Sequence, residues 1–271
     1  DSAQGLQAHV LIDGGPAGEN GADPQFVADR LQQLGVGTLE AVVLTHAHTD
    51  HFEGLPAVLT RFAIERFIYN GQVRSLGSYN TVLNLAQGNA DTVIAPVDLL
   101  PIDLTGAGGS TLTVIPPLTT YLGDTDDGSE LNEGSVGALL ERGAFSVFFT
   151  GDGEVEANSR WRRDFGTLSG AVDVLKVGHH GANDAIFDSG TGGSSTWLDH
   201  TAPSILLISA NGTTHPRNAA LDRMLGLSSS RTYCTNVHGD IELRVDLQGE
   251  PTVTVEKNAD MDCVAGSDAS T

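Results

Sequence analysis

The segment LTHAHTDHFEGL, residues 44–55, places three histidines and an aspartate within six residues. These four candidate metal ligands are His46, His48, Asp50 and His51. Imidazole and carboxylate without thiolate suit Zn, Mn or Fe better than a structural zinc site built from cysteines. A polar surface loop is the alternative. Because the whole chain has only nine histidines, their concentration here favours a metal site, in which His46 and His48 share one ion and Asp50 and His51 reach a second.

Further ligands must come from other segments, because four ligands in one loop cannot complete two sites. Asp152 in FFTGD is a candidate to bridge two ions, although Gly-Asp after a strand is by itself only a turn signal. His179 and His180 in LKVGHHG suit a metal or acid-base role, and two surface histidines are the alternative. Asp13 in LIDGG is expected to orient the histidine loop rather than to bind metal.

Each of these candidates follows a segment with the pattern of a buried strand. LEAVVLT, residues 39–45, is almost continuously apolar, as in a strand covered on both faces, and it leads into the histidine cluster. HVLIDGG leads to Asp13, AFSVFF leads to Asp152, and VDVLKVG leads to His179. We therefore expect the candidate site to lie at the ends of several strands, with the histidine cluster on a loop.

Helices are expected between these strands. PQFVADRLQQLG, residues 24–35, has apolar side chains at helical spacing and a glycine as a stop signal. VEANSRWRRDFG is also expected to be helical, and PRNAALDRMLGL is expected to hold Pro216 in its first turn. SVGALLERG and AFSVFFTGD predict a hairpin around Arg142 and Gly143. YLGDTDDGSE, residues 121–130, is expected to be an acidic loop.

These elements predict an α/β fold in which two sheets are sandwiched between helices. No linker divides the composition, so we expect one domain over residues 1–271, with a polar tail from about residue 258. Trp161 and Trp197 are expected to pack in the core rather than to stack on nucleic-acid bases.

The motifs HAHTDH, TGD and LKVGHHG resemble those of the metallo-β-lactamase superfamily. LIDGG, LTHAHTDHFEGL, LNEGSV, DVLKVGHHG and ISANGTTHP are similar, in this order, to the metallo-β-lactamase-like domain of the ComEC DNA-uptake competence family and its stand-alone relatives. The resemblance covers roughly residues 6 to 246. It implies a four-layer αββα sandwich with the metals at one edge.

The resemblance also implies roles for the candidate residues. His46 and His48 would bind the first metal, Asp50, His51 and His179 would bind the second, and Asp152 would bridge both. His180 or His215 would protonate the leaving group or hold the phosphate. Asp50 would take part in catalysis as well as in metal binding. For His215, packing in the NGTTHP turn is the alternative. A hydroxide between two ions is a nucleophile at neutral pH, so the chemistry implied is metal-dependent hydrolysis.

The sequence departs from the family pattern in two places. Many members supply a third histidine to the first metal, but no histidine lies between His51 and His179 here. The segment Asn132-Glu133-Gly134-Ser135 stands there instead, so the first site is expected to be weaker or to be completed by water, Asn132 or Glu133. We therefore expect one or two divalent ions, with Zn or Mn favoured.

The second departure follows LKVGHHG, where relatives continue with serine or threonine and this chain reads Gly181-Ala182-Asn183-Asp184. If that hydroxyl contacts substrate in the relatives, the specificity of this chain differs. The following segment DAIFDSGTGGSSTW, residues 184–197, is rich in glycine and serine and is expected to be a surface loop, with a lid as the alternative.

The composition limits the kinds of partner that the chain can be expected to bind. The 14 basic and 35 acidic residues give a formal charge of −21, so a broad basic footprint for duplex nucleic acid is absent. No window approaches the roughly 18 uninterrupted apolar residues of a membrane helix, so no membrane partner is expected. Cys234 and Cys263 could form a disulfide, with two free thiols as the alternative, and together with the acidic surface they favour a secreted, extracellular or periplasmic protein. The sequence does not predict the oligomeric state.

Three functions remain open at this stage. The first is a metal-dependent phosphodiesterase, specifically a nuclease acting on DNA, because the ComEC domain is thought to degrade DNA. The second is a hydrolase of a small ester, lactam, lactone or phosphorylcholine substrate, which the acidic surface favours. The third is a non-catalytic binding module that metal stabilises, which the incomplete first site suggests.

Overall fold

The computed structural model describes residues 8–17, 23–104, 109–168, 170–246 and 248–268. Residues 269–271, which end the expected polar tail, lie outside the described residues. The chain divides into two compact units. The first comprises Asp1–Leu100, Leu104–Gly108 and Val114–Val136, and the second comprises Pro101–Asp103, Gly109–Thr113 and Gly137–Thr271. The expectation that both units form one domain stays a prediction.

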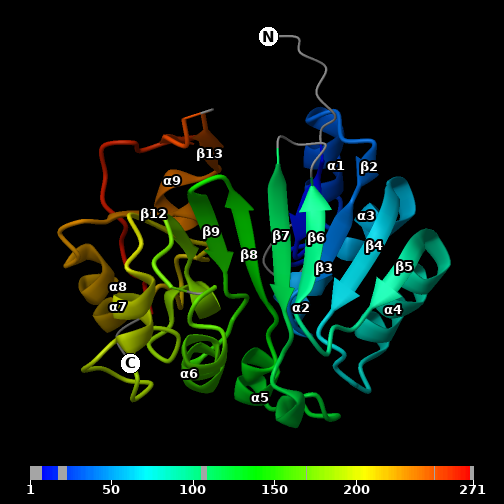
Figure 1. The fold of residues 1–271 in the computed structure, drawn as a ribbon, viewed down its shortest axis with the longest axis horizontal. Helices are drawn as coiled ribbons and strands as arrows, with labels where there is room; N and C mark the ends of the chain where they lie inside the picture. The colour runs from blue at the N-terminus through cyan, green and yellow to red at the C-terminus, as the bar shows by residue number, and fades with distance from the viewer. Residues whose placement is uncertain (1–7, 18–22, 105–108, 169, 247, 269–271) are drawn as a thin grey trace. The chain divides into compact units, whose positions relative to one another are not determined.

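The first unit contains a sheet of five described strands with helices packed against it (Figure 1). Its elements are β1 (Val10–Ile12), α1 (Phe26–Gln33), β2 (Thr38–Leu39), β3 (Ala41–Leu44), α2 (Thr49–Phe52), α3 (Leu55–Arg61), β4 (Ala63–Tyr69), α4 (Gly77–Asn89), β5 (Ala90–Ile94), the 3₁₀ turn η2 (Thr119–Tyr121) and α5 (Gly128–Glu133). The strand order is β1-β3-β4-β2, and β5 also pairs with β4. Side chains from α1, α3 and α4 share one apolar core with β2, β3 and β4.

Parallel pairing in this sheet brings the predicted strand ends together. β3 pairs with β1 and with β4 in parallel, and all four residues of β3 are buried. The register places Ile12 opposite Val43, so Asp13 and Thr45 leave the sheet at the same edge. Carboxyl ends of parallel strands commonly form such sites.

The second sheet has seven described strands in the order β12-β11-β10-β9-β8-β7-β6. It is built from β6 (Leu100–Leu104), β7 (Ser110–Ile115), β8 (Gly137–Arg142), β9 (Phe145–Phe149), β10 (Val174–Lys176), β11 (Ile205–Ile208) and β12 (Arg231–Cys234). The other elements of this part of the chain are α6 (Val155–Asp164), the turn η3 (Gly178–Gly181), α7 (Thr196–Thr201), α8 (Asn218–Leu225), α9 (Thr235–His238), β13 (Ile241–Val245) and β14 (Pro251–Val255).

This sheet is mixed. β8 and β9 form the antiparallel hairpin predicted around Arg142 and Gly143, whereas β9, β10, β11 and β12 are parallel neighbours. Because β9, β10 and β11 run in the same direction, the residues that follow them, among them Asp152 and His179, emerge at one edge of the sheet.

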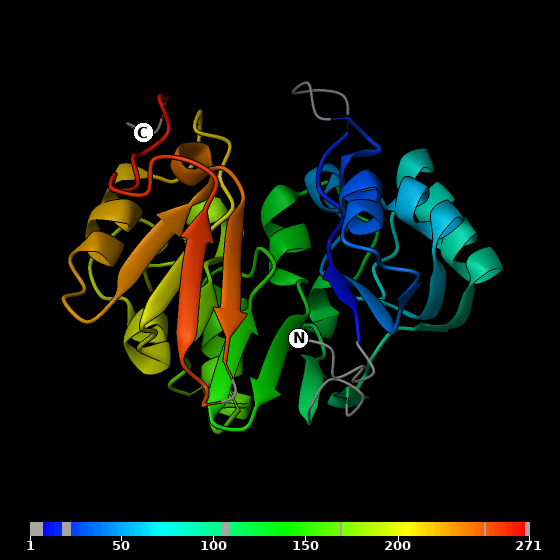
Figure 2. The same cartoon turned by 90° about the horizontal axis from the view of Figure 1, so that it is seen from above.

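Aromatic residues and a disulfide hold the second unit together. Trp161 and Trp197 are buried as predicted and pack edge-on against Phe148. The predicted disulfide between Cys234 and Cys263 is present and ties the C-terminal segment to the end of β12. β13 and β14 form an antiparallel hairpin, orange to red in Figure 2, whose apolar face packs on the sheet.

Several local expectations were wrong. Thr49–Phe52 is a short helix, so Asp50 and His51 do not lie in a loop. α8 begins at Asn218, and Pro216 precedes it instead of occupying its first turn. α5 begins at Gly128, inside the segment expected to be an acidic loop, because Asp127 caps it by accepting hydrogen bonds from two backbone N–H groups. β6 was not predicted. In the expected surface loop after Asp184, Ala185, Ile186 and Phe187 are buried.

Among the described helices, none has the length and apolar character needed to cross a membrane.

Candidate metal centre

The histidine cluster begins at Thr45, directly after β3. The Thr45 hydroxyl lies 2.8 Å from Asp13 Oδ2 and 3.0 Å from His46 Nδ1. A carboxylate only accepts hydrogen bonds, so Thr45 donates its single proton to Asp13 and accepts from His46 Nδ1. His46 is therefore held with its proton on Nδ1, and Nε2 carries the lone pair that a metal requires.

His48 faces that lone pair. His46 Nε2 and His48 Nδ1 are 3.0 Å apart, and the two ring centroids are 4.9 Å apart at nearly a right angle. His46 is fully buried. Because His46 Nε2 has no proton, His48 Nδ1 donates the hydrogen bond between these two nitrogens. A divalent ion bound by both nitrogens would take the place of that proton.

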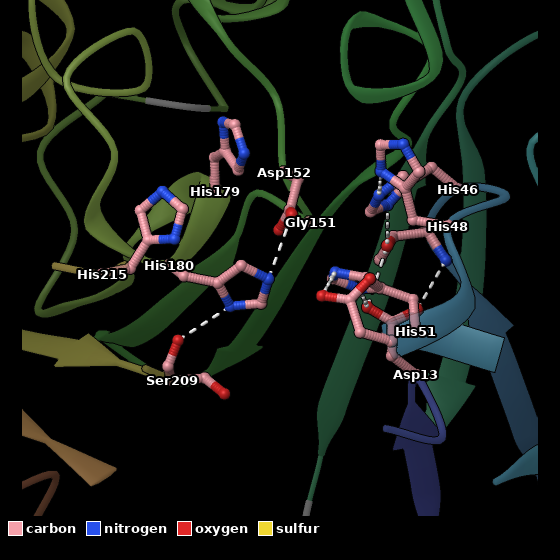
Figure 3. Close-up of polar contacts among 12 residues, drawn as sticks. Asp13, His46, His48, His51, Gly151, Asp152, His179, His180, Ser209 and His215 are labelled. Atoms are coloured by element: carbon pink, nitrogen blue, oxygen red, sulfur yellow. Dashed lines mark hydrogen bonds and ion pairs between the residues drawn. The ribbon is translucent and has the colours of Figure 1, made fainter. Parts of the chain in front are cut away.

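Asp13 also contacts His51. Its Oδ2 lies 2.7 Å from His51 Nδ1, and its Oδ1 accepts the Thr45 N–H at 2.8 Å (Figure 3). His51 Nδ1 thus donates to Asp13, and His51 Nε2 lies 3.9 Å from Asp50 Oδ2. The Asp13 carboxylate therefore sits behind the histidines, in the geometry expected of a group that orients them.

The local backbone explains why Asp13 reaches this place. Its φ is +62°, a left-handed conformation that aspartate and asparagine tolerate better than most residues. The following turn packs tightly on the chain after α2, because a Cβ at Gly54 would lie 2.1 Å from the Gly14 carbonyl oxygen. Gly54 also donates its N–H to Gly15. This close approach fixes α2, and with it Asp50 and His51, over the end of β1.

Asn132 and Glu133, the residues expected to complete the first site, are both buried at the end of α5. Val136, three residues after Glu133, donates its N–H to the Thr45 carbonyl oxygen, so this segment is hydrogen-bonded to the start of the histidine cluster. α5 begins beside His48, because a Cβ at Gly128 would lie 3.7 Å from His48 Nε2. The part of Asn132 and Glu133 in metal binding stays a prediction.

In the second unit, Asp152 and His180 lie next to each other. Asp152 is buried after β9, and its Oδ2 lies 3.2 Å from His180 Nε2 (Figure 3). His180 Nδ1 lies 2.8 Å from the Ser209 carbonyl oxygen, which can only accept, so His180 donates there. These contacts fix the His180 ring between the turn after β11 and Asp152.

His179 is held by two carboxylates that the sequence did not single out as site residues. Its Nδ1 lies 3.0 Å from Asp184 Oδ1 and 3.1 Å from Glu154 Oε1. Burial opposes the charged imidazolium, but the hydrogen bonds to Asp184 and Glu154 and the charge of Asp152 outweigh burial and raise the pKa of His179 to about 10. With Nδ1 taken by the carboxylates, Nε2 is the nitrogen that can bind metal.

The sequence gives only a weak signal for these two residues. Glu154 stands two positions after Asp152, and Asp184 lies in the segment that departs from the family pattern. Their approach to His179 depends on the turn η3, in which His179 and His180 have φ values of +40° and +53°. This left-handed conformation cannot be read from the residue types, because histidine adopts it only infrequently.

His215 joins the same group. Its ring centroid lies 5.3 Å from that of His179 and 6.0 Å from that of His180. Gly181 permits this approach, since its φ is +82° and a Cβ there would lie 2.8 Å from Pro216 Cβ. Burial, followed by the charge of His179, lowers the pKa of His215 to about 4, so the ring is neutral at pH 7.

The residues present fit a divalent metal. In the first unit, imidazole nitrogens and a carboxylate oxygen lie close together. The Nδ1 atoms of His46 and His51 are hydrogen-bonded to Thr45 and Asp13, which leaves their Nε2 atoms for a metal. In the second unit, Glu154, His179 and Asp184 each offer a ligand atom within 4.8 Å of the others. Such histidine and aspartate clusters are typical of sites that hold two metal ions. Cys234, His238 and Cys263 are also close together, but the disulfide occupies both sulfurs.

Comparisons with known proteins point to the family that the sequence motifs resemble. The model of the Metallo-beta-lactamase superfamily matches residues 5–125. ComE operon protein 3 of Bacillus subtilis is 29% identical over 220 residues, which are 79% of this chain and 26% of that protein. The chain therefore spans about a quarter of the curated relative that it matches.

One solved structure shows a similar fold at a TM-score above 0.5. A mutant of the CmlA beta-hydroxylase, a protein of Streptomyces venezuelae, has a TM-score of 0.51 at 16% identity and covers 83% of this chain and 48% of that chain. A putative metal-dependent hydrolase from Parabacteroides distasonis has a TM-score of 0.46 at 15% identity and covers 83% of this chain and 84% of that chain. At these identities the likeness concerns the fold alone. The family match over residues 5–125 and the fold agree with the motifs that the sequence carries: the chain has the metallo-beta-lactamase fold and is a distant homologue of ComE operon protein 3.

Proposed function

We propose that this chain is a metal-dependent phosphodiesterase that cleaves DNA. The match to the superfamily model and the histidine and aspartate clusters indicate the broader class, a metal-dependent hydrolase. The observation that carries the proposal is the pair of buried His46 and half-buried His48, whose ring nitrogens face each other at 3.0 Å beside His51, which Asp13 orients. We assign His46, His48, Asp50 and His51 of the first unit and Asp152 and His179 of the second as metal ligands.

A bound divalent ion would supply Lewis-acid activation of water and of the scissile phosphoryl group. The protein supplies proton transfer. His215 is neutral at pH 7, because burial and the nearby histidines lower its pKa to about 4. His180, fixed by Ser209 and Asp152, is therefore the better group to protonate the leaving oxygen, and His215 is suited to a hydrogen bond with the substrate.

Distant homology to ComE operon protein 3 and the resemblance to the ComEC DNA-uptake family support DNA as the substrate. The formal charge of −21 disfavours a long duplex footprint. A single strand that approaches through a few phosphates is therefore the DNA substrate that we expect.

A small ester, lactam, lactone or phosphorylcholine substrate is the second candidate, and one observation favours it. The acidic segment before α5 lies beside the histidine cluster: Gly128 approaches His48, while Arg74 hydrogen-bonds both the Ala47 carbonyl and Asp126. This charge would repel a phosphate backbone near His48 and would attract a cationic or neutral substrate.

The test compares substrates on one preparation. Metal-free protein is supplied with Mn or Zn and assayed with bis-p-nitrophenyl phosphate, single-stranded DNA, nitrocefin and a lactone. The proposal predicts cleavage of the first two, with loss in Asp152→Ala and retention in the control Asp164→Asn, whose carboxylate pairs with Arg163 on the exposed side of α6. Turnover of only the lactone or nitrocefin would favour the small-substrate hydrolase.

A non-catalytic module stabilised by metal is the remaining alternative. It predicts full metal occupancy after dialysis, with no turnover of any ester in the panel.

We also propose that the protein acts outside the cytoplasm, where the Cys234–Cys263 disulfide persists. A thiol assay on protein isolated under native conditions tests this, because a reduced pair of thiols would contradict it.

A further inference from the structure

The second unit contains a cavity that no step of the proposed reaction uses. It has a volume of about 270 Å³ and lies between α6 and the segment of residues 184–197. At roughly 30 Å³ per water molecule, this is room for about nine waters, or for a ligand with a similar number of non-hydrogen atoms. The cavity is thus smaller than the usual site of a drug-sized molecule.

One face of α6 forms a polar wall of the cavity. Val155, Asn158, Ser159 and Arg162 line it, at the spacing that puts side chains on one side of a helix. Asn158 is buried and donates from Nδ2 to the Ala185 carbonyl, but no described residue donates to its Oδ1. A buried amide oxygen without a donor is costly, so a ligand N–H or O–H would be favoured there.

The charges around the cavity have both signs. Arg160 and Arg163 of α6 pair with Asp164, whereas Arg162 lines the cavity together with Asp188. Burial would raise the pKa of the Asp188 carboxyl group, but hydrogen bonds from Ser194 and Thr196 and the charge of Arg162 lower it. Asp184 also lines the cavity. Its Oδ1 accepts from His179, and no described residue donates to its Oδ2, so this oxygen is available to a cation.

The rest of the lining is apolar and buried. Ile186, Phe187 and Trp197 provide it. The cavity therefore combines a guanidinium group, two carboxylates, an amide acceptor and an apolar surface.

We propose that this cavity binds a small zwitterion of the amino-acid type. The ligand carboxylate pairs with the Arg162 guanidinium, its ammonium donates to Asp184 Oδ2 and Asn158 Oδ1, and an aliphatic side chain packs on Phe187 and Trp197. L-Leucine has about the number of non-hydrogen atoms that the cavity admits. Since Asp184 also holds His179, the occupant would be in contact with the candidate metal centre through a single side chain.

Calorimetric titration of the full chain with L-leucine, isocaproate and isoamylamine tests the proposal. The latter two lack the ammonium and the carboxylate, respectively. We expect saturable binding of leucine and much weaker binding of both analogues. Arg162→Ala is expected to weaken leucine binding by about tenfold, the loss of one charge-assisted contact, while the neighbouring Arg163→Ala leaves it unchanged.

A second variant separates the cavity from chelation of metal by the amino acid. Ser159→Trp places a large side chain in the cavity and is expected to abolish binding while the protein stays folded by circular dichroism. Leucine binding that survives both Ser159→Trp and Arg162→Ala would overturn the proposal. The absence of saturable binding up to about 10 mM, or isoamylamine binding as tightly as leucine, would also overturn it.

Discussion

At the scale of single residues, the candidate centre depends on groups that hold the histidines as much as on the histidines. The sequence predicted the positions of His46, His48, Asp50 and His51 from their types and spacing, and it predicted that Asp13 would orient the loop. It did not identify Glu154 and Asp184. Their contact with His179 requires a left-handed turn at two histidines, which no residue pattern specifies. The roles of all these residues as ligands stay predictions.

Asp13→Asn tests the orienting contact. Asparagine tolerates the φ of +62° at this position, so the fold is expected to survive. The amide cannot accept from both Thr45 and His51 as the carboxylate does, so we expect metal affinity to fall by about 10–100-fold. Chelator competition measures the affinity, with Asp29→Asn, on the exposed surface of α1, as the control. Unchanged affinity would mean that Asp13 has no orienting role.

Metal binding in the second unit is expected to depend on pH. His179 in the metal-free protein has a pKa of about 10, so at pH 7 a metal at Nε2 must displace a proton. Apparent affinity is therefore expected to rise by up to about tenfold per pH unit between pH 7 and 9. Glu154→Gln removes one of the groups that raise this pKa, so the increase of metal affinity with pH is expected to level off at a lower pH. The exposed control Glu250→Gln is expected to keep the wild-type dependence of affinity on pH. Chelator competition at each pH measures this, and an affinity independent of pH would contradict it.

The same pKa has a consequence for the metal-free fold. The folded value of about 10 exceeds the unfolded value of roughly 6.5. The charged His179 therefore stabilises the fold fully below about pH 6.5, and this contribution is lost as the pH rises through about 10. Denaturant unfolding in the presence of chelator is expected to show it, and Glu154→Gln is expected to shift the loss to lower pH. A stability that does not fall between pH 7 and 10 would contradict this prediction.

At the scale of secondary structure elements, apolar runs predicted the strands that precede each candidate residue. They did so because a strand covered on both faces has a nearly continuous apolar sequence, as β3 has. The exceptions have local causes. Asp127 caps a helix inside an acidic segment, and a four-residue helix such as α2 is too short to show a periodic pattern.

The packing of the turn η3 against Pro216 is expected to be sensitive to a single methyl group. Gly181→Ala adds a Cβ 2.8 Å from Pro216 Cβ at a φ of +82°, so we expect a loss of about 1–3 kcal/mol in the free energy of unfolding. Gly192→Ala is the matched control, since nothing lies within 4 Å of its Cβ and its φ is not positive. Urea unfolding of both variants measures the difference, and equal stabilities would show that the close approach is not required.

At the scale of the whole molecule, the fold could be predicted because the ordered series of motifs spans nearly the entire chain and carries a known architecture. The disulfide was predicted from two cysteines and an acidic composition. The spacing of the two cysteines in the sequence does not show that they meet, because the bond requires the C-terminal segment to return to the end of β12. There His238 Nε2 also donates a hydrogen bond to the Met261 carbonyl oxygen.

Removing the disulfide is expected to destabilise the second unit. The bond closes a segment with a sequence separation of 29 residues, for which the loss of chain entropy corresponds to about 3–4 kcal/mol. A double variant with Cys234→Ala and Cys263→Ala should therefore unfold roughly 10 °C lower by calorimetry, while the conservative surface change Met261→Leu serves as the control. A melting temperature that does not change would show that the segment is held by its other contacts.

The most direct test of the central claim is metal content measured together with phosphodiester hydrolysis in the same samples. Wild-type protein, freed of metal and then supplied with Mn or Zn, is predicted to retain one or two ions after dialysis and to cleave bis-p-nitrophenyl phosphate. The double variant His46→Ala with His48→Ala is predicted to lose the first ion, to bind fewer ions than the wild type supplied with excess metal, and to lose activity, while Asp164→Asn keeps the wild-type metal content and activity. Wild-type protein that retains no metal, or cleavage that persists at the wild-type rate in the double variant, would contradict the account.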